Sequence, residues 1–162
     1  MTENIVRKIW GWAVRGPSLV FALVLLHAVT AYADEDGLLS APDAWQRYGD
    51  GELLIIDIRT QSEWRDTGIP EGAGRSSLFL SYGLPNLDFV DEVTALTGGD
   101  RSHPIALICA AGVRSAIAHV LLESEGFEQI YDIGEGMAGS GDGPGWVARG
   151  LPVEDCGDCS GS

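Results

Sequence analysis

Three short apolar runs lie along the middle of the chain, and segments with helical spacing of apolar residues separate them. The runs are Leu53–Asp57, Pro104–Cys109 and Gln129–Ile133. Continuous apolar runs of this length are typical of parallel strands that are covered on both faces. The alternation of strand and helix signals therefore predicts an α/β fold, with a small, mainly parallel β-sheet flanked by helices on both faces.

The helical pattern recurs between and after these runs. Helices are expected at residues 42–48, 61–66, 87–96 and 115–125. The last of them is the clearest, because its apolar residues form one stripe and Gly126 provides a stop signal. Within the second, Glu63 follows Arg59, and we expect Arg59 to form an ion pair with Glu63 or Asp57 beneath the active edge of the sheet.

The first 33 residues follow the pattern of a secretory signal peptide. Basic residues precede an apolar run at residues 19–26, and Ala31-Tyr32-Ala33 offers a small-x-small cleavage site. The run is shorter than the ~20 apolar residues of a good membrane span. We expect cleavage after Ala33 and a periplasmic or secreted protein with no stable membrane association; an uncleaved anchor and a buried helix are the alternatives.

The charge of the chain limits its partners. It has 162 residues, 24 acidic and 10 basic, and a formal net charge of −14. Binding to nucleic acid requires Lys and Arg against phosphates, so this composition argues against a nucleic-acid partner. We expect one domain at residues 34–153 and an acidic, unpacked tail at residues 154–162.

The candidate active site is a loop that joins the second strand to the clearest helix. The strand ends at Cys109, and the loop and helix start contain Ala110, Ala111, Gly112, Val113, Arg114 and Ser115. Ligands of open α/β sheets bind at the carboxyl ends of strands. The loop N–H groups and the helix N-terminus stabilise a thiolate there, which makes Cys109 a candidate nucleophile. Arg114 adds a cation for an anionic substrate. The alternative is a structural, buried cysteine.

Several segments resemble the rhodanese (thiosulfate sulfurtransferase) homology domain, over about residues 37–153. They are Leu54–Arg59, Ser62–Trp64, Gly68–Ala73, Cys109–Ala116, Gly126–Phe127 and Trp146–Val153. The resemblance implies a parallel sheet between helices and a Cys109 nucleophile that holds a sulfane sulfur as a persulfide. Residues 110–115 would bind the substrate, without a metal or organic cofactor. The donor would be thiosulfate or a persulfide, and the acceptor cyanide, a thiol or a protein.

Other interpretations remain open at this point. The chain could instead be a non-enzymatic persulfide carrier or a partner-binding module. A phosphatase or arsenate reductase is disfavoured, because the rhodanese-like phosphatases have a loop one residue longer than Cys109–Arg114. The glycine-rich segment Gly134–Gly145 departs from the family pattern and could be a mobile flap that gates the site. Its G-x-G-x-x-G spacing is no nucleotide motif, because Pro144 breaks the helix that such a motif requires.

The chain ends in a pair of cysteines, Cys156 and Cys159. An oxidising compartment favours a local disulfide on an exposed tail. The alternative is a dithiol that accepts sulfur from the Cys109 persulfide. One C-x-x-C pair is not a set of four zinc ligands, so no metal site is expected.

Overall fold

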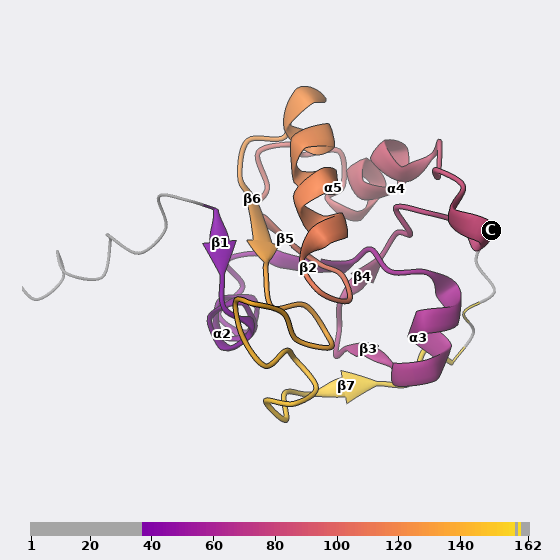
Figure 1. The fold of residues 1–162 in the computed structure, drawn as a ribbon. Coiled ribbons are helices and arrows are strands. Elements are labelled where there is room, and N and C mark those ends of the chain that lie inside the picture. Colours follow the sequence, from indigo (N-terminus) through magenta and orange to yellow (C-terminus); the bar gives the residue numbers. More distant parts are fainter. Residues whose placement is uncertain (1–36, 158, 160–162) are drawn as a thin grey trace, which may run out of the picture. The chain divides into compact units, whose positions relative to one another are not determined.

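The computed structural model describes residues 37–157 and residue 159, and this part of the chain has an α/β fold (Figure 1). Five strands form one sheet in the order β1-β6-β5-β2-β4, and all neighbours are parallel. They are β1 (Leu38–Leu39), β2 (Leu54–Asp57), β4 (Gly74–Arg75), β5 (Ile105–Ile108) and β6 (Ile130–Ile133). An antiparallel pair, β3 (Ile69–Pro70) and β7 (Val153–Glu154), lies outside this sheet.

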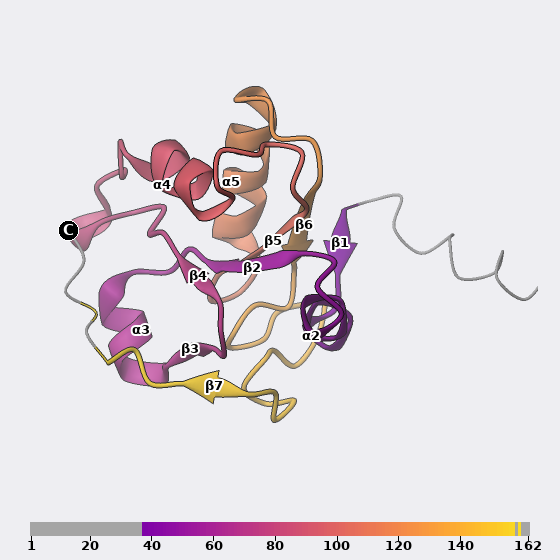
Figure 2. The ribbon, with the colours of Figure 1, turned by 180° about the vertical axis from the view of Figure 1, so that it is seen from behind.

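Helices cover both faces of the five-stranded sheet. They are α2 (Ala41–Gly49), α3 (Gln61–Thr67), α4 (Phe89–Leu96) and α5 (Val113–Ser124), with a 3₁₀ turn, η1 (Ser81–Gly83). Figures 1 and 2 show α4 and α5 on one face, with α2 and α3 on the opposite side. The prediction of a small, mainly parallel sheet flanked by helices is therefore confirmed.

The alternation of side chains along the central strands divides the core into two layers. Ile105 and Leu107 of β5 point to the face covered by α4 and α5, where they pack with Phe89 and Leu122. Ala106 and Ile108 point to the other face and pack with α2 and Trp146. Because side chains alternate with a period of two, Cys109 follows Leu107 onto the α5 side.

Within its described residues, 154–157 and 159, the C-terminal segment is held to the domain at Glu154, Cys156 and Cys159, and there the expectation of an unpacked tail is wrong. Val153 and Glu154 pair with β3, and Cys156 and Cys159 form a disulfide that is 7% and 5% exposed, respectively. The two half-cystines form an apolar cluster with Trp64 and Ile69. The residues next to the cysteines are polar, so no pattern in the sequence indicates this packing. A disulfide is itself apolar, however, and this one covers the side of Trp64 that would otherwise be open.

The predicted signal peptide at residues 1–33 lies outside the described residues, so cleavage and export stay predictions. None of the helices that the structure does describe has the length and apolar character of a membrane span.

Candidate functional site

Cys109 lies at the carboxyl edge of the sheet, directly after β5 and just before α5. Its side chain is 1% exposed and belongs to the core layer beneath α4 and α5. The Cys109 sulfur lies 3.5 Å from Oγ of Ser115, which is in the first turn of α5. The prediction that strand, loop and helix bring Cys109 to a helix N-terminus therefore agrees with the structure.

The Ser115 side chain lies beside the Cys109 sulfur. It is fully buried, and its Oγ donates a hydrogen bond to the carbonyl oxygen of Gly112 at 2.9 Å. With its single proton used there, the hydroxyl oxygen can accept from the Cys109 S–H; a rotated hydroxyl can instead donate to a thiolate. The Ser115 hydroxyl can therefore act as acceptor or as donor in a hydrogen bond with Cys109.

The loop between Cys109 and α5 leaves backbone donors for a ligand. The N–H of Ala116 donates to the carbonyl oxygen of Gly112 at 3.2 Å and begins the hydrogen-bond ladder of α5. The N–H groups that precede it, those of Val113, Arg114 and Ser115, have no acceptor one helical turn before them, so they suit a negatively charged sulfur. Gly112 has φ 81°, and a Cβ there would overlap with the carbonyl of Gly134. Only glycine both adopts this positive φ readily and has no Cβ to overlap with Gly134.

The glycine-rich segment Gly134–Gly145 forms a wall of the site. Met137 N–H donates to the carbonyl oxygen of Cys109, and Ala138 N–H donates to that of Ala110, both at 2.9 Å. These bonds hold the segment against the Cys loop. The segment is therefore hydrogen-bonded to the peptide that carries Cys109, and the mobile flap stays a prediction.

A buried carboxylate anchors this wall from behind. Glu135 accepts the N–H of Ala41 at 2.7 Å, the N–H of Gly145 at 2.9 Å and the Nε–H of Arg149 at 2.6 Å. Burial by itself would raise the pKa of Glu135, but these hydrogen bonds outweigh it and the pKa is lowered. The carboxylate is therefore ionised and fixes the glycine-rich segment to the start of α2.

Arg114 is paired with a carboxylate. Its Nη1 and Nη2 donate to Oε2 and Oε1 of Glu63 at 2.7 and 2.5 Å, a fork that spans from α5 to α3. Burial would raise the pKa of Glu63, but the hydrogen bonds from Arg114 and Thr60 lower it from 4.5 to about 2. The same hydrogen bonds raise the pKa of Arg114. Sequence reasoning expected this cation to face an anionic substrate, whereas the structure places it against Glu63.

Glu63 has a second structural role. Its Oε2 accepts the backbone N–H of Thr60 at 3.0 Å, while Thr60 Oγ1 accepts the N–H of Glu63 at 3.4 Å. This capping box starts α3 and holds the Glu63 side chain in a fixed position. The Thr60-x-x-Glu63 spacing was the signal that could have identified it, although only the fold shows that Arg114 lies within reach.

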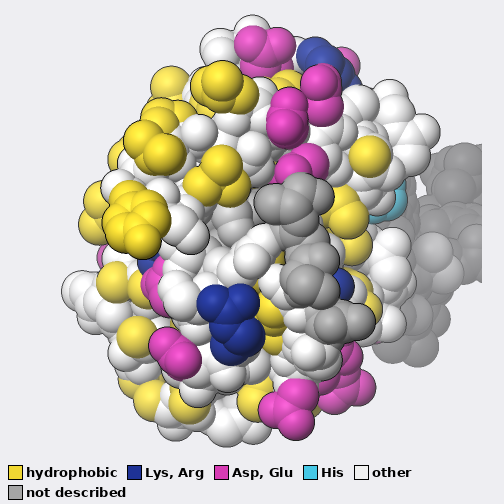
Figure 3. Space-filling view, turned by 90° about the vertical axis from the view of Figure 1, so that its right-hand side faces the viewer, with side chains coloured by type: hydrophobic (Ala, Val, Ile, Leu, Met, Phe, Trp, Pro, Cys, Tyr) yellow, Lys and Arg dark blue, Asp and Glu magenta, His cyan; other side chains and the backbone are white. Residues whose placement is uncertain are grey.

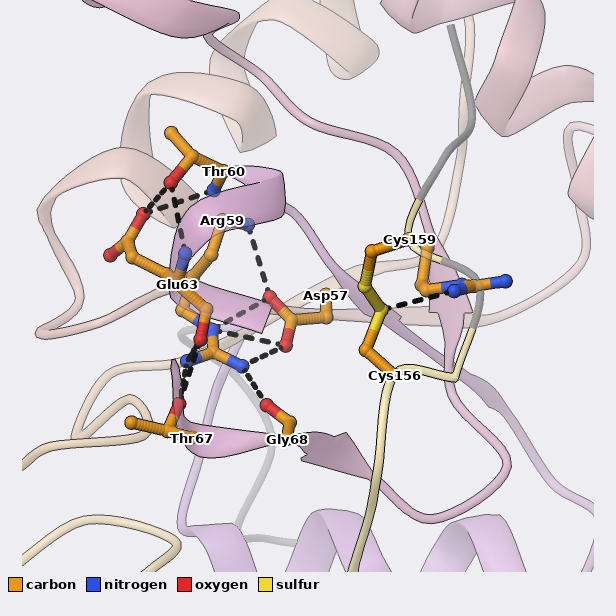
Figure 4. The surroundings of a disulfide bond; sticks show 9 residues. Asp57, Arg59, Thr60, Glu63, Thr67, Gly68, Cys156 and Cys159 are labelled. Atoms are coloured by element: carbon orange, nitrogen blue, oxygen red, sulfur yellow. Dashed lines mark hydrogen bonds and ion pairs between the residues drawn. A yellow bond between two sulfur atoms is a disulfide. The ribbon is translucent and has the colours of Figure 1, made fainter. Parts of the chain in front are cut away.

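The expected ion pair of Arg59 is present, with Asp57 as its partner. Arg59 Nη2 donates to Asp57 Oδ2 at 2.7 Å, and its Nε lies 3.0 Å from both carboxylate oxygens. Arg59 also donates to Thr67 Oγ1 and the carbonyl oxygen of Gly68, so its charge is enclosed (Figure 4). This network lies between the disulfide and α3, and its bonds tie the end of β2 to the end of α3.

Two hollows adjoin the Cys loop. The first, here named the Ala110 hollow, has a volume of about 400 Å³ and polar lining residues Arg59, Glu63, Asp66 and Thr67. Its apolar lining residues are Ala110, Met137, Ala138, Val147 and Ala148. The second, the Tyr82 hollow, measures about 460 Å³ and lies between Arg114, Thr60 and residues 79–83. Glu63 borders the first and Arg114 the second, so their salt bridge bounds both.

The surface around η1 is apolar. Leu80, Tyr82, Leu84 and Leu87 are exposed there, Tyr82 completely. In Figure 3, which views the molecule from the side of η1, hydrophobic side chains are widespread and charged ones are scattered between them. The mouth of the site therefore offers contacts for an apolar group next to the paired charges.

The fold and the site define an α/β protein that holds one buried cysteine between a central parallel strand and a helix N-terminus. Comparison with known proteins identifies its family: residues 40–140 match the rhodanese-like domain, and the chain belongs to that family. Sulfurtransferases are among its members. This confirms the resemblance noted from the motifs.

Two curated relatives show the range of the family. An uncharacterized protein of Rickettsia rickettsii is 35% identical over 101 residues, 61% of this chain and 80% of that protein. The thiosulfate sulfurtransferase GlpE of Glaesserella parasuis is 28% identical over 116 residues, 72% of this chain and 91% of that protein.

Solved structures share the fold. Rv0390 from M. tuberculosis superposes with a TM-score of 0.62 at 24% identity, covering 73% of this chain and 96% of that one. The rhodanese-like domain of an Anabaena protein gives 0.56 at 26% identity, with 74% and 79% covered. The polysulfide-sulfur transferase of Wolinella succinogenes gives 0.53 at 22% identity, with 87% and 94% covered.

Proposed function

We propose that this protein is a sulfurtransferase that carries a sulfane sulfur as a persulfide on Cys109. The observation that supports it most is the position of the Cys109 sulfur, buried at the end of β5 and 3.5 Å from Ser115 in the first turn of α5. A thiolate there is the nucleophilic form of cysteine, and the helix N-terminus favours its charge. The named relative GlpE, a thiosulfate sulfurtransferase, supports the same reaction class.

The reaction has two half-reactions at one sulfur. The Cys109 thiolate attacks the outer sulfur of thiosulfate or of a persulfide, a new S–S bond forms, and sulfite or a thiolate leaves with the electron pair of the broken bond. In the second half-reaction, cyanide, a thiol or a protein thiol attacks the outer sulfur of the Cys109 persulfide and regenerates the thiolate. The N–H groups of Val113, Arg114 and Ser115 stabilise the charge on the outer sulfur.

A persulfide carrier is the second candidate, and the burial of Cys109 favours it. Cys109 is 1% exposed, so a persulfide on it would be sheltered from bulk solvent and would persist between loading and transfer, as a carrier requires. A carrier and an enzyme form the same Cys109 persulfide and differ in turnover with small acceptors.

Intact-mass measurement tests both candidates. We expect the protein to gain one sulfur atom after incubation with thiosulfate or an organic persulfide and to lose it to cyanide or a thiol. Cys109→Ser should gain none and should keep the fold, because serine is close in size to cysteine. Repeated turnover identifies the enzyme, and one transfer per chain to a protein acceptor alone identifies the carrier. Equal labelling of Cys109→Ser and the native chain would exclude Cys109 as the nucleophile.

A further inference from the structure

The arginines that border the Ala110 and Tyr82 hollows are paired with carboxylates. Arg59 is held by Asp57 and Arg114 by Glu63, each through a salt bridge of 2.7 Å or less. Asp66 lies on the wall of the Ala110 hollow and adds negative charge. Arg65 lines a hollow that adjoins the Tyr82 hollow and shares Thr60, Phe79, Leu80 and Tyr82 with it, and its positive charge is offset by the negative charge of Asp66. Within the described residues, the approach to the Cys loop therefore carries no net positive charge.

This balance matters for the choice of sulfur donor. Thiosulfate is a small dianion, and its binding site must supply positive charge to replace its hydration. Here the forked hydrogen bonds to Glu63 engage both terminal nitrogens of Arg114. The low pKa of Glu63, about 2, means that its charge is present at any ordinary pH. A dianion that enters either hollow consequently meets a carboxylate beside the cation.

The remaining walls suit an organic group. Ala110, Met137, Ala138, Val147 and Ala148 give the Ala110 hollow an apolar side. On the far side of the salt bridge, Phe79, Leu80 and Tyr82 border the Tyr82 hollow. Both hollows beside the Cys loop thus combine neutralised charge with apolar contacts.

We propose that the preferred sulfur donor is an organic persulfide with an uncharged, apolar carrier group, and that Glu63 sets this preference against thiosulfate by neutralising Arg114. This inference rests on the proposed sulfur transfer through Cys109. The Cys109 thiolate attacks the outer sulfur of R–S–SH. A new S–S bond forms on Cys109 while the S–S bond of the donor breaks, and R–S⁻ leaves with the electron pair of that bond. The proton stays on the transferred sulfur and the leaving thiolate takes the electron pair, so the step needs no oxidant or reductant. Glu63 is a specificity-determining residue and contacts no reacting atom.

Glu63→Gln removes the charge with little change in shape. Glutamine serves in a capping box, so Thr60 keeps its partner and α3 keeps its start. One side-chain oxygen then remains for the donors of Thr60 and Arg114, and the amide nitrogen cannot accept the second arm of the Arg114 fork. Glu52→Gln is a matched control, because Glu52 also pairs with an arginine, Arg47, on the surface and lines neither hollow.

The experiment compares two donors on the full chain. Thiosulfate and the persulfide of N-acetylcysteine methyl ester are each mixed with protein, and the initial rate of Cys109 persulfide formation is measured by intact mass. The quantity of interest is the thiosulfate-to-persulfide rate ratio of each variant divided by that of the native chain. This removes the intrinsic difference in reactivity between the donors.

We expect this relative ratio to rise about tenfold for Glu63→Gln at low salt, since a unit charge at close range acts on a dianion. It should stay at one for Glu52→Gln, and the gain should shrink in high salt because salt screens exposed charges. Asp66→Asn, an exposed position, should shift the ratio in the same direction by a smaller factor. A purely structural role for Glu63 would change both donors equally.

Two results would overturn the inference, and they differ from each other. A relative ratio of one in both Glu63→Gln and Asp66→Asn, with normal loading, would show that charge at this wall does not select the donor. Absence of loading by either donor in the native chain would overturn the proposed sulfur transfer itself, and this inference with it.

Discussion

Breaking the Cys156–Cys159 disulfide should destabilise the whole rhodanese-like domain, even though the bond closes a ring of only four residues. The sequence separation of the cysteines is 3. In the chain-entropy treatment, closing so short a ring restricts the unfolded chain by about 2 kcal/mol at room temperature. The disulfide also covers Trp64 and Ile69, and Cys156 Sγ accepts a hydrogen bond from Arg75 at 3.1 Å. These contacts link the disulfide, which is drawn in Figure 4, to α3, β3 and β4.

The assay is urea unfolding followed by circular dichroism, with and without dithiothreitol, in a Cys109→Ser background so that the reductant acts on the tail pair alone. Reduction should lower the free energy of unfolding by about 2 kcal/mol, and the melting temperature by roughly 5–10 °C for a domain of this size. Replacing both cysteines by serine should cost more, because two hydroxyls are then buried beside Trp64. Unchanged midpoints after full reduction would refute the reasoning and show that the tail does not contribute to the folded domain.

Two further predictions concern Glu63 and Tyr82. The pKa of Glu63 is lowered to about 2 in the fold, so its ionised form stabilises the protein fully above about pH 4.5, and this contribution is lost as the pH falls toward 2. Urea unfolding at pH 5 and pH 3 should therefore show a smaller acid loss in Glu63→Gln, by on the order of 1 kcal/mol after allowance for partial exposure; equal losses would contradict the low pKa. Tyr82 has φ 62° and is fully exposed, so Tyr82→Gly should relieve left-handed strain without loss of packing and raise the unfolding free energy by about 0.5–1 kcal/mol. A lower unfolding free energy would show that the tyrosine side chain makes stabilising contacts.

The central part of the fold could be predicted because its signals are local. The strands β2, β5 and β6 consist mostly of apolar residues, and the helices between them have apolar stripes and recognisable ends. The strands β1, β3, β4 and β7 are only two residues long, so they have no period that a sequence pattern could show. Their positions depend on pairing with segments far along the chain, as Val153 does with Pro70.

The tail shows where a rule based on polarity fails. Residues 154–162 contain acidic and small residues, and such segments usually stay in solvent. What the composition does not show is the open side of Trp64, which needs an apolar cover and receives it from the oxidised cysteines. The glycine-rich segment illustrates a related limit of composition. Gly136 allows close approach to the backbone of Ala110, where a Cβ would overlap with it, and a count of glycines does not show this packing.

Arg114 shows why the local motif predicted the position of Cys109 better than the surroundings of the arginine. The features that direct Cys109 toward a helix N-terminus lie within seven residues of sequence, from Cys109 to Ser115. The effective charge of Arg114 depends on Glu63, which is 51 residues away and is held in place by its own capping box. A motif can therefore identify an arginine beside a reactive cysteine, but whether that arginine attracts an anion is decided by a partner on another helix. For the same reason, the position that corresponds to Glu63 is the one to compare first when donor preference differs between proteins with the same Cys loop.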